Sequence, residues 1–312
     1  MKVVLLNSAK TQKDILDFGK ETYENFKDKY DVVEYVNYAS DFSDVRELFD
    51  SQEKLLMFNH FSVEGMFETL SKHLHGFNNV KYILSTYSSY AGLDLDLLKQ
   101  LGIRYRNNGG ANAKAVAQLA LNHMFMLLTR VNLLSKDKAS GLGEEFHGKT
   151  ASVIGMGNIG EEIAKSLTGL GIKTNYYNRS KKNVPYELVD YDDVFNSDLI
   201  FISIATTKET KELLKDLHKK LKPHNYLIDI TAIDELYDKH AVLEKLKDEG
   251  IKGYGIEFFD EVPESFDVDA NVVATPHIAW ATIEAERRTI EWYFGNAIKI
   301  LEGRVQEIDF IV

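Results

Sequence analysis

The chain has 312 residues, of which 44% are hydrophobic and 27% are charged, as is ordinary for a soluble globular protein. Its net charge of −11 disfavours nucleic acid and anionic membrane surfaces as partners. The absence of cysteine excludes disulfides, thiolate metal sites and catalytic thiols. No cluster of His and acidic residues has metal-ligand spacing, so no metal is expected. No apolar run is long enough for a signal peptide or a membrane span, which favours a cytoplasmic location.

Short apolar runs alternate with helical patterns along most of the chain, which predicts an α/β fold with mainly parallel sheets. In the first third, strands are expected at 3–7, 32–35, 55–59 and 82–85. A long, nearly all-apolar pattern then predicts a buried helix from Ala113 to Leu134. Further strands are expected at 151–155, 173–177, 199–204, 226–230, 253–258 and 272–274, before a last helix from Ile283 to Glu302.

The most informative motif begins at the end of the strand expected at 151–155. It is a G-x-G-x-x-G turn between a strand and a helix, with the sequence Gly155-Met156-Gly157-Asn158-Ile159-Gly160. This context is typical of dinucleotide binding. Gly155 permits the tight turn, Gly157 lets the backbone approach a pyrophosphate, and Gly160 allows close packing of helix on strand. The alternative is a glycine-rich turn that binds no ligand.

The residues after the next strand bear on the choice between NAD and NADP. Folds that bind NAD usually place an Asp or Glu there, which bonds the ribose 2′-hydroxyl. This chain has Asn178 in that place, followed by Arg179, Ser180 and Lys181. Asn does not repel a 2′-phosphate, and the residues after it can bind one through charge-assisted hydrogen bonds. NADP(H) is therefore favoured over NAD(H), the alternative being a solvated basic loop.

Five ordered segments resemble motifs of the D-isomer-specific 2-hydroxyacid dehydrogenase family. They are 107–117 (N-x-P-G-x-N-A-E-A-V-A in the family), the glycine turn with its strand, 207–210 (T-P-E-T), 222–223 (K-P) and 275–279 (T-P-H-I-A). The resemblance implies two Rossmann-like α/β domains, one flavodoxin-like and one dinucleotide-binding, with an interdomain cleft. The substrate domain would comprise 1–102 plus 281–312, and the dinucleotide-binding domain 103–280. A small-molecule substrate and a homodimer are also implied.

The resemblance further assigns roles to single residues. His277 matches the family's acid, which protonates the alkoxide formed when a hydride reaches a 2-oxo carbon. Glu257 stands where the family has an Asp on the nicotinamide side. Further cofactor contacts are expected at Thr206, Thr207, Thr231 and Ala232, and substrate contacts at Tyr87, Ser88, Ser89 and Trp280.

Two catalytic positions depart from the family pattern. In an ungapped alignment, the substrate-binding Arg falls on Ile233 and the Glu that partners the catalytic His falls on Val262. Without the Arg, a substrate carboxylate loses a bidentate partner, and transition-state stabilisation should fall. A one-residue slip would instead place Asp260 or Glu261 beside the catalytic His.

Three interpretations remain open. The first is an NAD(P)-dependent oxidoreductase that reduces a 2-oxo acid or an atypical carbonyl substrate with His277 as acid/base. The second is a catalytically inactive dinucleotide-binding protein, such as a redox sensor or regulatory partner. The third is an ordinary 2-hydroxyacid dehydrogenase, which requires the alignment at Ile233 to be wrong and would be supported if Arg104 or Arg106 reached the nicotinamide. The retained His277 and Glu257 favour the first.

Overall fold

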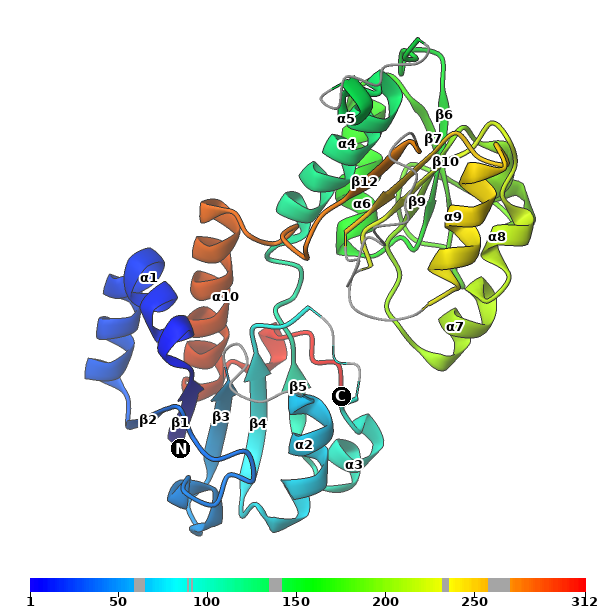
Figure 1. The fold of residues 1–312 in the computed structure, drawn as a ribbon. Coiled ribbons are helices and arrows are strands. Elements are labelled where there is room, and N and C mark those ends of the chain that lie inside the picture. Colours follow the sequence, from blue (N-terminus) through cyan, green and yellow to red (C-terminus); the bar gives the residue numbers. More distant parts are fainter. Residues whose placement is uncertain (59–64, 89, 91, 135–141, 232–235, 258–269) are drawn as a thin grey trace. The chain divides into compact units, whose positions relative to one another are not determined.

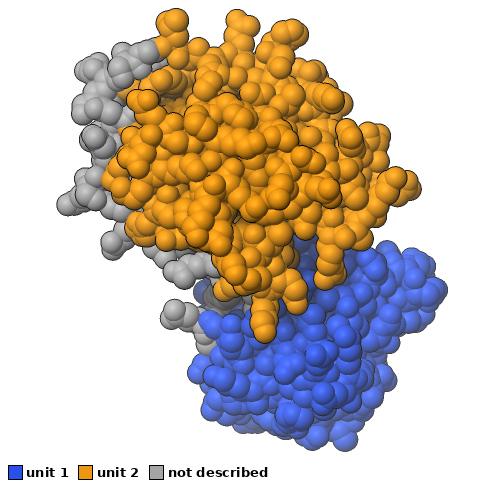
Figure 2. Space-filling model, turned by 90° about the vertical axis from the view of Figure 1, so that its right-hand side faces the viewer, with its two compact units in different colours: residues 1–112, 283–312 blue, residues 113–282 orange. Residues whose placement is uncertain are grey.

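The computed structural model describes residues 1–58, 65–88, 90, 92–134, 142–231, 236–257 and 270–312 (Figure 1). The chain divides into two compact units, Met1–Asn112 with Ile283–Val312 and Ala113–Thr282 (Figure 2). Each unit is built on its own parallel sheet, which confirms the predicted fold class. The division suggested by the sequence lay at 102/103 and 280/281. The short strand at Arg104–Arg106 pairs with the strand at Val80–Ser85, which ties this segment to the first unit.

The first unit is a five-stranded parallel sheet with helices on both faces (Figure 1). Its elements are β1 (Lys2–Asn7), α1 (Ala9–Lys29), β2 (Val32–Val36), η1 (Arg46–Phe49), β3 (Lys54–Phe58), α2 (Met66–His73), η2 (Leu74–Gly76), β4 (Val80–Ser85), α3 (Leu95–Gln100), β5 (Arg104–Arg106), α10 (Ile283–Leu301) and η4 (Val305–Glu307). The strand order β2-β1-β3-β4-β5 is that of flavodoxin. Successive strand residues point to opposite faces. Val3 and Leu5 therefore pack with α1 and α10, whereas Val4 and Leu6 pack with α2 and α3.

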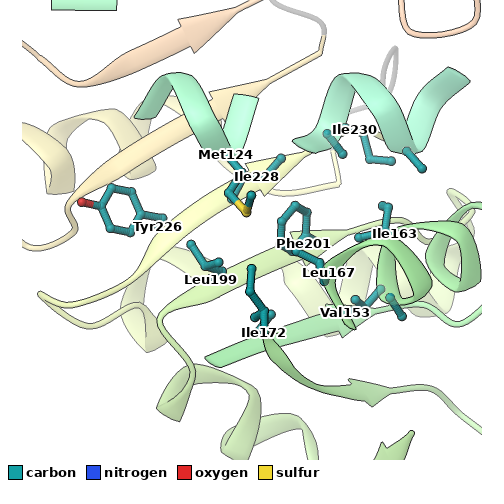
Figure 3. Close-up of a cluster of buried hydrophobic side chains, with 14 of the residues drawn as sticks. Met124, Val153, Ile163, Leu167, Ile172, Leu199, Phe201, Tyr226, Ile228 and Ile230 are labelled. Carbon is teal, nitrogen blue, oxygen red and sulfur yellow. The ribbon is translucent and has the colours of Figure 1, made fainter. Parts of the chain in front are cut away.

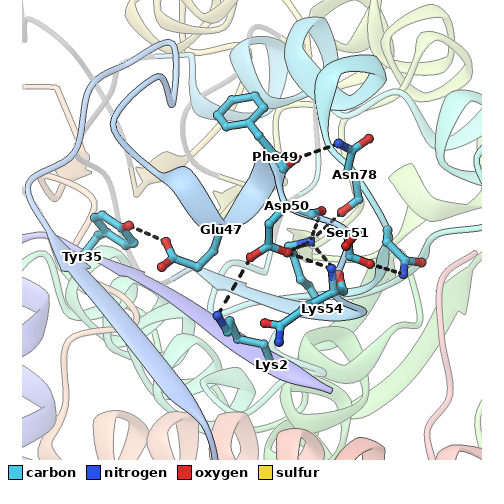
Figure 4. Close-up of polar contacts among 10 residues, drawn as sticks. Lys2, Tyr35, Glu47, Phe49, Asp50, Ser51, Lys54 and Asn78 are labelled. Atoms are coloured by element: carbon cyan, nitrogen blue, oxygen red, sulfur yellow. Dashed lines mark hydrogen bonds and ion pairs between the residues drawn. The ribbon is translucent and has the colours of Figure 1, made fainter.

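The first residue of β3, Lys54, is a buried lysine (Figure 4). The Lys54 side chain is fully buried, and its ammonium donates to the carbonyl oxygens of Asp50, Gln52 and Asn78 at 2.8, 2.6 and 2.9 Å. It also pairs with the Asp50 carboxylate at 2.8 Å. These acceptors offset the loss of hydration, so Lys54 is a structural clamp.

The second unit is a seven-stranded parallel sheet in the order β12-β11-β10-β9-β6-β7-β8. Its elements are α4 (Ala113–Thr129), α5 (Val131–Leu134), β6 (Thr150–Ile154), α6 (Asn158–Gly169), β7 (Lys173–Tyr177), β8 (Glu187–Leu188), η3 (Tyr191–Asn196), β9 (Leu199–Ile202), α7 (Lys208–Leu214), α8 (Leu217–Lys220), β10 (Tyr226–Asp229), α9 (Lys239–Lys247), β11 (Gly253–Ile256) and β12 (Val272–Ala274). Figure 3 shows Met124 of α4 and Leu167 of α6 in one buried cluster with Phe201 and Ile228 of the strands. A second cluster, which includes Leu214, Leu217 and Leu246, joins α7, α8 and α9 to the sheet.

The predicted strands are all present in the described residues, with ends that agree to within about two residues. The prediction of one helix over 113–134 was wrong. Arg130 has φ +58°, which separates α4 from α5. The strands β5 and β8 were not predicted, because their few residues carry too short a pattern. No helix in the described part of the chain is long and apolar enough to cross a membrane.

Candidate active site

The glycine turn follows β6 and adopts a shape that only glycine permits at two places. Gly155 has φ +98°, and a Cβ there would lie 2.3 Å from Ile204 Cγ2 and 2.7 Å from the Ser203 carbonyl oxygen. A Cβ on Gly160 would lie 2.0 Å from the Gly155 carbonyl oxygen. The structural roles predicted for Gly155 and Gly160 are therefore confirmed.

Gly157, at the N-cap of α6, is different because no described atom lies near the place where its side chain would begin. A Cβ built there meets no heavy atom within 4 Å, and no side chain caps the helix. Met156 is 3% exposed and Ile159 packs on the core, so they point away from solvent, whereas Asn158 is exposed. The helix start thus has no side-chain cap and open space beside Gly157, and a helix end of this kind favours an anion such as a pyrophosphate.

Ser203, the residue after β9, contacts the glycine turn through its side chain. Its hydroxyl donates to the Gly155 carbonyl oxygen at 2.8 Å. Further along, Thr207 caps α7 in a reciprocal pair with Thr210, whose hydroxyl accepts from the Thr207 N–H at 2.8 Å. The Thr207 hydroxyl is thus used within the helix cap, and Thr206 is half-buried beside it.

Asn178 links the glycine turn to the basic loop that follows β7. Its Oδ1 accepts from the Met156 N–H at 3.3 Å, and its Nδ2 donates to the Ser180 carbonyl oxygen at 2.9 Å. Arg179, Ser180 and Lys181 are exposed. The side chain that replaces the family's acid therefore shapes the loop, and the cationic side chains remain at the surface.

His277 follows β12 and has an unusual backbone conformation, in which both its N–H and its carbonyl oxygen are hydrogen-bonded. Its φ is +50°, which costs a non-glycine residue about 1–3 kcal/mol. The N–H donates to the carbonyl oxygens of Glu257 and Thr275 at 2.9 and 3.1 Å, and the carbonyl oxygen accepts from the Trp280 indole N–H at 3.0 Å. The imidazole is half-buried, and burial lowers its pKa. Strain held in this way is typical of functional sites.

Glu257 follows β11, and its carboxylate contacts the loop after β12 that carries His277. It is 1% exposed. Its Oε1 accepts from the Ala279 N–H at 2.6 Å and its Oε2 accepts from the Thr275 hydroxyl at 2.7 Å. Burial raises its pKa, although both hydrogen bonds favour the charged form. Both oxygens thus bind the loop that carries His277.

A buried histidine of α4 extends this arrangement. His123 is fully buried, and its Nε2 lies 3.2 Å from the Thr275 Oγ1. Because the Thr275 hydroxyl donates to Glu257, the imidazole donates to Thr275 and carries its proton on Nε2. Its Nδ1 has no hydrogen-bond partner among the described residues. Burial lowers the pKa of His123 to about 4, so the ring is neutral at neutral pH.

Thr231, after β10, lies beside a second buried carboxylate. Asp229 is 2% exposed, and its Oδ1 accepts from the Thr231 N–H and hydroxyl at 2.8 and 2.6 Å. Its Oδ2 accepts from the Tyr237 hydroxyl at 2.5 Å, and Tyr237 contacts Tyr254 at 2.8 Å. This network fixes the backbone where the chain leaves β10.

Of the substrate residues expected in the first unit, Tyr87 and Ser88 belong to the described part of the segment between β4 and α3. The Tyr87 ring packs on Phe67 and Phe58 with centroid distances of 5.4 and 6.3 Å. The Ser88 hydroxyl donates to Asn112 at 3.1 Å, and the Ser88 carbonyl oxygen accepts from Asn107 at 2.6 Å.

The two arginines of the third interpretation both contact the C-terminal tail. Arg104 stacks on Phe310 at 3.9 Å, and Arg106 lies 3.9 Å from Asp309. The expectations at Ser89, Ala232, Ile233, Asp260, Glu261 and Val262 fall outside the described residues.

Three residues of the site were missed by the sequence analysis: Ser203, His123 and Asp229. A histidine inside an otherwise apolar helix was a signal that could have drawn attention to His123. Ser203 and Asp229 carried no signal, because only the fold brings them to the turn and the strand end. Within the described ranges, no group of His, Asp or Glu is arranged to hold a metal ion.

Comparison with known proteins gives a consistent result. Residues 119–279 match the NAD binding domain of D-isomer specific 2-hydroxyacid dehydrogenases. A hydroxypyruvate reductase of Thermotoga maritima is 31% identical over 227 residues, which cover 67% of this chain and 74% of the relative. A glyoxylate reductase of Pyrococcus furiosus is 31% identical over 253 residues, which cover 72% of this chain and 74% of the relative.

Solved structures share the fold along the whole chain. An acyclic imino acid reductase (Bsp5), in complex with NADPH and D-Arg, has a TM-score of 0.82 and 21% identity, with 100% of both chains covered. D-lactate dehydrogenase from Aquifex aeolicus, complexed with NAD and lactic acid, has a TM-score of 0.76 and 21% identity, with 99% of each chain covered. Together with the sequence matches, these findings mean that the chain belongs to the D-isomer specific 2-hydroxyacid dehydrogenase family and is an NAD(P)-dependent oxidoreductase acting on a hydroxy or carbonyl group.

Proposed function

We propose that this chain is an NADPH-preferring reductase of a 2-oxo acid or a related carbonyl compound, with His277 as proton donor. The observation that carries the proposal is the strained, doubly held backbone of His277. It follows β12, at the same carboxyl-end edge of the sheet as the glycine turn after β6 and Asn178 after β7. Ligands of open parallel sheets bind at this edge.

The chemistry follows from these positions. When bound, the reduced nicotinamide supplies a hydride to the carbonyl carbon. His277 donates its imidazole proton to the carbonyl oxygen as negative charge develops there. Gly157 and the start of α6 bind the pyrophosphate, and Arg179, Ser180 and Lys181 bind the 2′-phosphate.

Two observations bear on the identity of the substrate. The relatives named above as hydroxypyruvate and glyoxylate reductases favour a small 2-oxo acid. Ile233, at the family's Arg position, favours a carbonyl compound that does not need a bidentate cation. We place Tyr87, Ser88, Ser89 and Trp280 at the substrate, and we propose a cytoplasmic homodimer. An inactive dinucleotide-binding protein is not favoured for a member of a family of reductases.

The rate of reduction should depend on pH through His277. Burial lowers the pKa of its imidazole below the usual histidine value of about 6.5. As pH rises, the protonated form that donates the proton is therefore lost at a lower pH than for an exposed histidine. We expect kcat/KM for reduction to fall as pH rises through that lowered pKa, and kcat/KM for alcohol oxidation to fall as pH decreases through it. Initial rates in both directions, measured from pH 5 to 9, report the value. An apparent pKa above about 7 would contradict this assignment.

Cofactor preference should depend on Arg179. Replacing Arg179 by Ala removes a charge-assisted hydrogen bond to the 2′-phosphate and should raise KM for NADPH about 10-fold or more. KM for NADH should stay within about 2-fold, since NADH has no 2′-phosphate. Lys173 is an exposed cation at the start of β7, the strand that precedes Arg179, so Lys173→Ala is the matched control and should change neither value. Equal losses for both cofactors would contradict a 2′-phosphate site.

A further inference from the structure

We propose that His123 and Thr275 are positioning residues, which act through Glu257 to fix the loop that places the His277 imidazole. The proposal rests on the proposed role of His277 and adds residues for which the family resemblance gave no role. His123 and Glu257 are buried and Thr275 is half-buried, and their side chains connect α4, the loop after β12 and the residue after β11.

The hydrogen bonds lead from His123 through Thr275 to Glu257, which in turn binds the backbone of the loop after β12. His123 Nε2 donates to Thr275 Oγ1 at 3.2 Å, Thr275 Oγ1 donates to Glu257 Oε2 at 2.7 Å, and Glu257 Oε1 accepts from the Ala279 N–H at 2.6 Å. The Glu257 carbonyl oxygen also accepts from the His277 N–H at 2.9 Å. Glu257 therefore holds residues on both sides of the imidazole, and its own orientation depends on Thr275.

His123 is not explained by packing. It lies on α4 among the apolar core residues Ala120, Met124 and Leu127, where an aliphatic side chain would fit the environment. A histidine there leaves its Nδ1 buried and without a partner in the described structure, which costs free energy. Residues that break a local rule at such a cost are expected where function requires them.

The experiment compares substitutions that remove the hydrogen bonds with ones that keep them. Thr275→Val and His123→Leu remove the hydroxyl and the ring donor at similar volume. Thr275→Ser keeps a hydroxyl, and His123→Gln places an amide N–H near the position of Nε2. Met124→Leu, at the next buried position of α4, controls for repacking of the helix. Each variant is made in the full chain.

Two measurements report the effect. The first is kcat against KM for NADPH in the proposed reduction. We expect kcat to fall about 10- to 100-fold in Thr275→Val and His123→Leu, since small misplacements of a reacting group have effects of this size. KM for NADPH should change less than about 2-fold, and Thr275→Ser and His123→Gln should recover most of kcat.

The second measurement does not need turnover. The chain has two tryptophans, so Trp292→Phe leaves Trp280 as the single tryptophan, whose fluorescence is excited selectively and whose indole N–H bonds the His277 carbonyl oxygen. Acrylamide quenching of Trp280 should increase in Thr275→Val and His123→Leu, whereas thermal stability of His123→Leu should equal or exceed that of the unsubstituted protein.

The outcomes separate this proposal from the proposed function. If no substrate is turned over but quenching changes as expected, the proposed function fails and the positioning line stands. If kcat and quenching are unchanged in Thr275→Val and His123→Leu, the proposal is overturned. It is also overturned if His123→Leu and His123→Gln lose thermal stability and activity together, because His123 is then a packing residue.

Discussion

Replacing His277 by Ala should reduce kcat for carbonyl reduction by about 100- to 10,000-fold, the usual contribution of a positioned general acid. The reason is that the imidazole is the group we place beside the developing alkoxide. The affinity for NADPH should stay within about 3-fold, because the glycine turn and the start of α6 bind the phosphates. Stopped-flow or steady-state absorbance gives kcat, and fluorescence titration gives the affinity.

A matched control is available for this substitution. His147 is exposed on the same unit, so His147→Ala should leave kcat and affinity unchanged. His277→Ala should also remove the limb of the pH profile assigned to the imidazole. Full turnover in His277→Ala would move the proton donor to another residue and would contradict the proposed mechanism.

Two alanine substitutions in one glycine turn should have opposite consequences. Gly160→Ala places a Cβ 2.0 Å from a backbone oxygen that cannot move without distorting β6, so we expect a loss of about 3 kcal/mol in the free energy of unfolding. The midpoint of thermal unfolding should fall by roughly 5–10 °C. Gly157→Ala meets no heavy atom within 4 Å and has an extended backbone, so its stability should match that of the unsubstituted protein.

The difference between the two variants lies in cofactor binding. The methyl group of Gly157→Ala would occupy the space we assign to the pyrophosphate, so NADPH affinity should fall about 10- to 100-fold in a normally folded protein. Gly169→Ala, at the far end of α6 with open space around it, is the control for both measurements. Unchanged NADPH binding in Gly157→Ala would remove the phosphate from this helix start.

Local pattern was sufficient for much of the fold and for the outline of the site. Apolar runs located the predicted strands because both faces of these sheets are covered, so most strand residues are apolar. The G-x-G-x-x-G spacing predicted the packing of Gly160 on Gly155, since close approach of helix and strand leaves no room for a side chain. The T-P-H-I-A segment located His277 through family resemblance alone.

The contacts that determine the shape of the site could not be predicted in this way. His123 and Thr275 are 152 residues apart, and only the packing of α4 on the sheet brings them together. The hydrogen bond from the Trp280 indole N–H to the His277 carbonyl oxygen was not anticipated, while the contact of Trp280 with substrate stays a prediction. The hydrogen bonds by which the Asn178 amide joins the glycine turn to the basic loop were likewise not anticipated, and its contact with the cofactor stays a prediction. Side-chain direction of this kind follows from tertiary packing and not from spacing.

The most direct test is the consumption of NADPH and NADH, followed by absorbance, with a panel of 2-oxo acids, aldehydes, simple ketones and mixtures of a 2-oxo acid with an amine. We expect turnover of a carbonyl compound with NADPH preferred over NADH, and loss of that turnover in His277→Ala. Tight NADPH binding without consumption across the whole panel would contradict it and would indicate a dinucleotide-binding protein without reductase activity.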